Sequence, residues 1–209
     1  MAADGQATWF DETGGMKHFP LRKLLRLGSH SALATAGAGI GVRMGLAFQQ
    51  FVQQQVVESI DDIARKAFPF FSDQYTGWHP GKRILSISST DPEESSEGAF
   101  PMAGVYFILA GYSFQDREKP YRIYLLGSDE DRLRIFPPSP ILVIPRSLSL
   151  ERTLEMHCRR QSSLEQLLSL CRSFLTKRSA EEGEVGPPFS FATITASGFR
   201  EFPEQEVGE

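Results

Sequence analysis

Residues 2–8 read Ala2-Ala3-Asp4-Gly5-Gln6-Ala7-Thr8. Two small residues lead directly into an acid, a glycine and a threonine, which is the pattern of a strand that has just ended in a turn. We therefore expect Asp4 to follow the first strand. The segment from Gly5 to Pro20 is predicted to be a loop or a hairpin, with Gly14-Gly15 as its turn.

Two strand-length segments follow this hairpin. Residues 22–27 alternate between two faces, and residues 31–36 form a run of small side chains. Gly28-Ser29 is a tight connection between them, so the two segments are predicted to pair as a β-hairpin.

The apolar period then changes from that of a strand to that of a helix. Between Ile40 and Val56, apolar residues recur at three- and four-residue steps, which predicts an amphipathic helix. Ser59 with Asp62 has the spacing of a helix cap, so a second helix is predicted to begin there. We expect it to run to about Phe68 and to end at Pro69.

The remainder of the chain repeats the order of strands and then helices. Residues 70–80 are expected to be irregular, and the acidic stretch 91–98 to be an exposed loop. Further strands are predicted at 82–88, 105–111, 121–126, 133–136 and 141–144, helices at 149–159 and from Ser162 to Gly183, and last strands at 189–195 and 198–202. This order predicts an α+β fold, with one domain over 1–203 and an acidic tail at 204–209.

A resemblance to a known family follows from these segments. The strand-end acid, the basic segment Leu21-Arg22-Lys23-Leu24 and the small-residue run 31–39 resemble the proteasome β-type fold of the N-terminal-nucleophile hydrolases. HslV-like subunits share the Asp-Gly-Gln-Ala-Thr stretch and a later Met-Lys, here Met16-Lys17. The end of the chain, from Gly186 to Thr195, is similar to the last strand of the family. The resemblance implies a four-layer αββα sandwich, in which two sheets lie between pairs of helices.

The family's chemistry implies roles for two charged residues. Asp4 would pair with Lys23, whose fixed positive charge would sit beside a nucleophilic threonine. The resemblance puts that threonine roughly a dozen residues before Met1. We therefore expect a threonine-type peptidase or amidase subunit that is inactive as written. The alternative is a non-catalytic, ring-forming or interaction homologue.

Further site residues are implied by the same resemblance. A backbone N–H near Ala34 or Thr35 would face the oxyanion, and Thr8 would line the wall that binds the substrate main chain. Gln6 would point into a specificity pocket, and Glu182 would stand in for a late catalytic acid. Two family motifs are absent: no Gly-Ser-Gly occurs near residues 145–147, and Val185 stands where a serine is expected.

The glycines at 37, 39 and 41 have a second interpretation as part of a dinucleotide-binding loop. That motif expects its third glycine where Val42 stands, and an acid about twenty residues further on at the end of a second strand. A glutamine-rich helical segment follows here instead, so the signal is weak.

Composition excludes several classes of partner. The 209 residues carry a net charge of -4 and a pI near 5.7, which disfavours nucleic-acid and anionic-membrane partners. Four scattered histidines predict no metal site, and no cofactor is expected. Cys158 and Cys171 are predicted to be reduced thiols of a cytoplasmic protein without a signal peptide. The stretch 32–48 is too interrupted to span a bilayer. The partners that the resemblance implies are like subunits in a ring, a peptide substrate if the protein is active, and an ATPase unfoldase.

Overall fold

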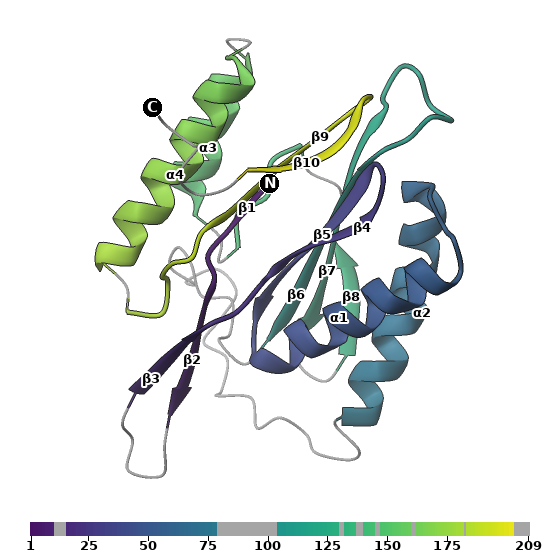
Figure 1. The fold of residues 1–209 in the computed structure, drawn as a ribbon, viewed down its shortest axis with the longest axis horizontal. Coiled ribbons are helices and arrows are strands. Elements are labelled where there is room, and N and C mark those ends of the chain that lie inside the picture. Colours follow the sequence, from purple (N-terminus) through teal and green to yellow (C-terminus); the bar gives the residue numbers. More distant parts are fainter. Residues whose placement is uncertain are drawn as a thin grey trace, which may run out of the picture.

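A computed structural model describes residues 1–10, 16–78, 104–129, 132–136, 140–144, 147–159, 162–181 and 183–202. Within these residues the fold is α+β, as expected, with four helices and three antiparallel sheets (Figure 1). Several predictions concern segments outside the described residues: the Gly14-Gly15 turn, the strand 82–88, the acidic stretch 91–98 and the tail 204–209.

The largest sheet is a five-stranded antiparallel meander. Its strands lie in chain order and are β4 (Leu24–Gly28), β5 (Ser31–Gly37), β6 (Val105–Tyr112), β7 (Tyr121–Asp129) and β8 (Arg132–Phe136). The five strands predicted from these segments are confirmed. β6 is the central strand and is buried on both faces along most of its length, which matches its continuous apolar run.

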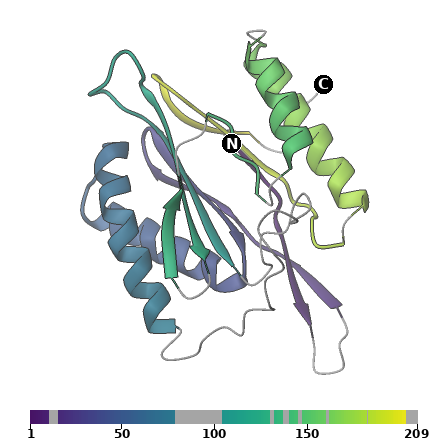
Figure 2. The ribbon, with the colours of Figure 1, turned by 180° about the vertical axis from the view of Figure 1, so that it is seen from behind.

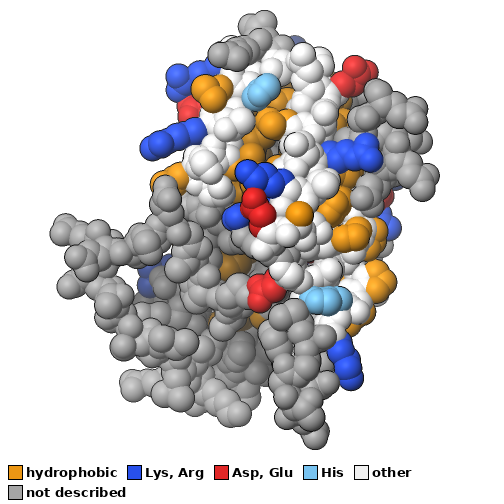
Figure 3. All heavy atoms as spheres, turned by 90° about the vertical axis from the view of Figure 1, so that its left-hand side faces the viewer, with side chains coloured by type: hydrophobic (Ala, Val, Ile, Leu, Met, Phe, Trp, Pro, Cys, Tyr) orange, Lys and Arg blue, Asp and Glu red, His pale blue; other side chains and the backbone are white. Residues whose placement is uncertain are grey.

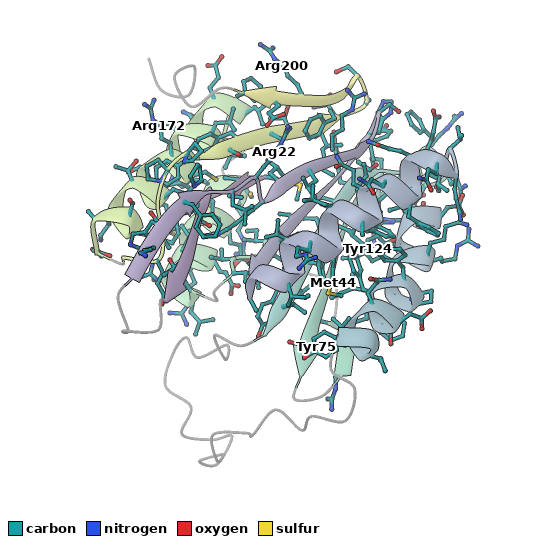
Figure 4. The ribbon with its side chains drawn as sticks, turned by 60° about the horizontal axis from the view of Figure 1, so that its bottom comes forward. Arg22, Met44, Tyr75, Tyr124, Arg172 and Arg200 are labelled. Atoms are coloured by element: carbon teal, nitrogen blue, oxygen red, sulfur yellow. The ribbon has the colours of Figure 1, made fainter. Side chains whose placement is uncertain are left out.

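Helices α1 (Gly39–Gln54) and α2 (Ile60–Trp78) cover one face of this sheet (Figures 1 and 2). Phe48 of α1, Phe71 of α2 and Phe107 of β6 are fully buried between them. The rings of Phe71 and Phe107 stack with their centroids 3.9 Å apart. Met44 and Tyr75 lie in the same layer between helices and sheet (Figure 4).

The prediction that α2 ends at Pro69 is wrong, because the helix continues through the proline to Trp78. A proline inside a helix costs about 3 kcal/mol. The apolar stripe of α2 continues past it, and burying each further large side chain contributes about 1.5–3 kcal/mol. The stripe is at most 2% exposed and comprises Ile60, Ile63, Ala67, Phe71 and Tyr75.

A three-stranded sheet packs against the other face of the five-stranded sheet. Its order is β1-β9-β10, from β1 (Ala2–Ala3), β9 (Ser190–Thr195) and β10 (Gly198–Phe202). The last two strands were predicted from the sequence, and β10 lies at the edge. The sheets meet through small buried side chains, which permit close approach: Ala32 and Ala34 of β5 cluster with Ala192 of β9.

The far face of the three-stranded sheet is covered by α4 (Leu164–Glu181). Leu168, Cys171 and Leu175 of this helix pack on Phe189 and Phe191. α3 (Leu148–Arg159) lies beside α4 in both ribbon views (Figures 1 and 2). Both helices were predicted, and α4 ends before Gly183 as expected.

The sequence has the spacing of a helix cap at Ser162 and Glu165, but the cap of α4 lies one residue later. Ser163 and Gln166 form a reciprocal capping box in place of Ser162 and Glu165: the Ser163 N–H donates to Gln166 Oε1 at 2.8 Å, and the Gln166 N–H donates to Ser163 Oγ at 3.2 Å. At α2, the predicted capping hydroxyl of Ser59 has no hydrogen-bond partner among the described residues.

The strand predicted at 141–144 does not form. These residues are half-buried but belong to no regular element. Prolines at 140 and 145 flank the short apolar run, and proline cannot donate to a strand ladder, so a pairing could not extend beyond these four residues at either end.

The remaining sheet is a two-stranded hairpin that projects from the body of the molecule (Figures 1 and 2). It consists of β2 (Gln6–Phe10) and β3 (Met16–Pro20), paired in the register that opposes Thr8 and His18. The hairpin alternative for residues 5–20 is thereby confirmed. None of the helices in the described part of the chain is long and apolar enough to cross a bilayer.

Candidate functional site

The charged groups of Asp4 and Lys23 meet, as predicted. Asp4 directly follows β1, and Lys23 immediately precedes β4 rather than lying on a strand as expected. Lys23 Nζ is 2.7 Å from Asp4 Oδ2, and the side chains are only 15% and 19% exposed, respectively. The pair therefore joins the three-stranded sheet to the five-stranded sheet in a largely desolvated position.

The neighbouring backbone holds both members of the pair in place. The Gln6 N–H donates to Asp4 Oδ2 at 3.2 Å, which gives the carboxylate a second donor besides Lys23. The Thr35 N–H donates to the Lys23 carbonyl at 2.9 Å, and the Thr35 hydroxyl lies 3.4 Å from the same oxygen. A carboxylate with two donors and a lysine with an anchored main chain form a preorganised charged site.

A second ion pair next to the first ties the same two sheets. Arg22 Nη2 is 2.6 Å from Glu201 Oε2 on β10 (Figure 4). Both side chains of this pair are more than a third exposed, so the pair contributes less to the stability of the fold than the Asp4–Lys23 pair does. On the face shown in Figure 3, the coloured acidic, basic and apolar side chains are mixed, without a large area of one charge.

The residues proposed to carry the oxyanion donor belong to the five-stranded sheet. Ala34 and Thr35 both lie inside β5, 8% and 3% exposed. The Thr35 N–H is already bonded to the Lys23 carbonyl, so in this conformation it cannot face an oxyanion. Ala34 is in register between Leu24 and Ile108, within the sheet. Thr35 therefore holds the main chain of Lys23 in place, a role that the sequence did not indicate.

Thr8 and Gln6 both belong to β2, the first strand of the projecting hairpin. Thr8 lies on the projecting hairpin, where its hydroxyl is 3.3 Å from His18 Nδ1. The Gln6 side chain contacts the segment after α4, where its Nε2 donates to the Gly183 carbonyl at 2.6 Å. Glu182, the proposed late acid, lies outside the described residues.

The segment after α4 lies against the Asp4 backbone, which sequence reasoning missed. The Gly5 N–H donates to the Gly186 carbonyl at 3.1 Å. A Cβ atom at Gly5 would lie 2.1 Å from the Pro188 oxygen, and one at Gly186 would lie 2.0 Å from Gln6 Oε1. The Gly5 position therefore requires glycine, because the clash would be with backbone, whereas a side chain at Gly186 would displace the end of the Gln6 side chain.

The dinucleotide interpretation of the 37–41 glycines is excluded by the topology. That fold needs a parallel βαβ unit, whereas β5 pairs antiparallel with both of its neighbours. Packing explains two of the glycines instead. Gly37 has φ +88°, and its Cβ position would be 2.0 Å from the Gly104 carbonyl oxygen, while Gly41 lies against Val105.

A second polar cluster lies apart from this site and joins α2 to the β6–β7 hairpin. Asp61 accepts hydrogen bonds from the hydroxyls of Ser113, at 2.6 Å, and Tyr124, at 3.0 Å. Burial, and then Asp61, raise the pKa of Tyr124. In the turn between β6 and β7, the pKa of Asp116 is lowered, first by a backbone hydrogen bond from Lys119 and then by a hydrogen bond from the Arg122 side chain. Because every group in the cluster is satisfied by a neighbour, we interpret it as structural.

Across the described residues, no three His, Cys, Asp or Glu side chains gather in a way that could hold a metal ion. Neither a protein family nor a curated protein matches the sequence.

Proposed function

We propose that this chain is a proteasome-like subunit of the N-terminal-nucleophile hydrolase class, of the threonine-type peptidase or amidase kind. The observation that carries the proposal is the 2.7 Å ion pair between Asp4 and Lys23, two residues that lie 19 positions apart in the chain. The resemblance predicts this pairing, whereas the local sequence around either residue does not require it.

The pair would provide a fixed positive charge to a nucleophile. An ammonium group within about 4–6 Å of a titratable group favours its deprotonated form by about 1–3 pKa units. Asp4 would keep the ammonium of Lys23 in position and offset its desolvation. The nucleophile in this proposal is a threonine hydroxyl on a strand ahead of Asp4, with the amino group of that threonine as its base.

The packing of the elements supports the same class. α1 and α2 cover the five-stranded sheet, its other face meets the three-stranded sheet, and α4 covers that sheet in turn. This succession is compatible with the four-layer αββα sandwich of the N-terminal-nucleophile hydrolases. The partners that we propose are like subunits in a ring and, for the peptidase, an ATPase that unfolds its substrates.

One observation favours a second candidate, a non-catalytic ring-forming homologue. The Thr35 N–H, which was expected near the oxyanion, is bonded to the Lys23 carbonyl. A site without that donor loses a large contribution to transition-state stabilisation. In this second function, the Asp4–Lys23 pair would only join the two sheets.

The test uses the protein isolated from the cells that produce it. Its N-terminal residue is determined by mass spectrometry, and hydrolysis of fluorogenic peptides is compared with that of a Lys23→Met variant. The peptidase predicts a threonine ahead of Ala2 and a loss of turnover of about 100-fold or more in the variant.

The other results separate the two candidates. Absence of turnover together with the mass of a multi-subunit ring in light scattering supports the non-catalytic homologue. Turnover that persists in Lys23→Met contradicts the proposed role of the pair, and an inactive monomer contradicts both candidates.

A further inference from the structure

The loop that joins α4 to β9 contacts the Asp4–Lys23 site through the side chain of Gln6, besides the backbone contact of Gly5. Gln6 Nε2 donates to the Gly183 carbonyl at 2.6 Å, across 177 positions of sequence. The same residue donates its backbone N–H to Asp4 Oδ2 at 3.2 Å. Asp4 Oδ2 is also the atom that accepts from Lys23 Nζ. Hydrogen bonds therefore connect the loop to the Gln6 side chain, the Gln6 backbone to Asp4, and Asp4 to the ammonium group.

The shape of the loop fits the Gln6 side chain closely. A Cβ atom at Gly186 would lie 2.0 Å from Gln6 Oε1, so no other residue can occupy that position while Gln6 stays where it is. The Gly5 N–H donates to the Gly186 carbonyl at 3.1 Å, and this bond fixes the backbone next to Gln6 relative to the loop. The loop therefore fixes both the direction of the Gln6 side chain and the position of the backbone next to it.

We infer that Gln6 is a positioning residue, through which the loop 183–186 fixes the Asp4 carboxylate and thereby the Lys23 ammonium. This inference rests on the proposed function for its significance, because Lys23 is the group that would stand beside the nucleophile. It reassigns Gln6 from substrate specificity to the alignment of the charged pair. Displacement of the end of α4 would then change the order of the Lys23 side chain without touching it directly.

A purely structural role for Gln6 would stabilise the fold but leave Lys23 unchanged in the folded state. The two roles are distinguished by observing the ammonium group itself. Hydrogen-bonded ammonium protons exchange slowly with water, and NMR on ¹⁵N-labelled protein measures this exchange for each lysine. Exposed Lys177 on α4, whose Nζ lies 3.8 Å from Glu181, is the internal reference.

Two variants disturb the contact of Gln6 with the loop in different ways, and a third serves as the control. Gln6→Ala removes the side-chain donor, whereas Gly186→Ala keeps it but occupies its space. Gly183→Ala is the matched control, because its Cβ would meet nothing within 4 Å and its carbonyl acceptor is retained. All exchange rates are measured on folded protein, well below the unfolding transition.

We expect the exchange of the Lys23 ammonium protons to rise about threefold to tenfold in Gln6→Ala, the factor that one ordinary hydrogen bond contributes to an equilibrium. Gly186→Ala should produce a similar rise, and the double variant Gln6→Ala with Gly186→Ala should add little to either. Gly183→Ala and the Lys177 signal should stay unchanged.

An unchanged Lys23 exchange rate in folded Gln6→Ala overturns the inference. If Gln6→Ala does not fold, Gln6→Asn, which is shorter by one methylene, is measured against the same prediction. The readout requires no turnover, so its failure leaves the proposed function standing. Conversely, absence of hydrolysis leaves the coupling of Gln6 to Lys23 untouched.

Discussion

A double-mutant cycle on Asp4 and Lys23 tests the feature on which the functional reasoning depends. Breaking a fully buried ion pair on one side costs about 3–5 kcal/mol, because the remaining charge is uncompensated. Exposed pairs contribute about 0–1 kcal/mol. With side chains 15% and 19% exposed and a contact of 2.7 Å, this pair lies between the two limits, nearer to the buried one.

We therefore expect Asp4→Ala to lower the free energy of unfolding by about 2–3 kcal/mol, in the range for hydrogen bonds to charged groups. Lys23→Met, which keeps most of the aliphatic stem, should cost a similar amount. The double variant should cost less than the sum, with a coupling energy of about 1–2 kcal/mol. Urea denaturation followed by circular dichroism measures all four proteins.

The control is Glu155→Ala, which removes an exposed pair with Arg159 on α3, where the side chains are 50% and 77% exposed. It should cost no more than about 0.5 kcal/mol. A coupling energy between Asp4 and Lys23 as small as that control would show that the two groups do not meet in solution. That result would also refute the catalytic interpretation of the site.

Three further predictions concern other parts of the molecule. Phe71→Ala should lower the free energy of unfolding by about 3–5 kcal/mol in urea titrations, because the ring is fully buried; a loss below 1 kcal/mol would contradict its place in the core. The folded-state pKa of Asp116 is depressed below its ordinary value of 3.8, so the stability that it contributes should be present above pH 3.8 and lost as the pH falls further. The difference in unfolding free energy between the parent and Asp116→Asn should accordingly shrink at acid pH, and a difference independent of pH would refute this. Burial raises the pKa of the Cys171 thiol, whereas Cys158 is exposed. Iodoacetamide at pH 8 should therefore alkylate Cys158 first, which peptide mass spectrometry can show. Equal alkylation rates are expected in urea, and equal rates in the folded protein would contradict the burial of Cys171.

Local pattern was sufficient for most of the elements. The 3.6-residue period of α1 and the apolar runs of β6 and β7 depend on neighbours in sequence, so their positions could be predicted. Pro69 shows the limit of this reasoning. A proline predicts the end of a helix, but the core contacts of Phe71 and Tyr75 lie on other elements and keep the helix intact.

The sequence by itself determined the order of the elements and, through a resemblance, the meeting of Asp4 with Lys23. Only the tertiary structure decided what surrounds that pair. The bond from Thr35 to the Lys23 carbonyl depends on the register of β5, and the bond from Gln6 to Gly183 joins opposite ends of the chain. Such contacts leave no local pattern, because their acceptors are backbone carbonyls, which every residue carries. They form only when the packing of two sheets brings distant segments within about 3 Å of each other.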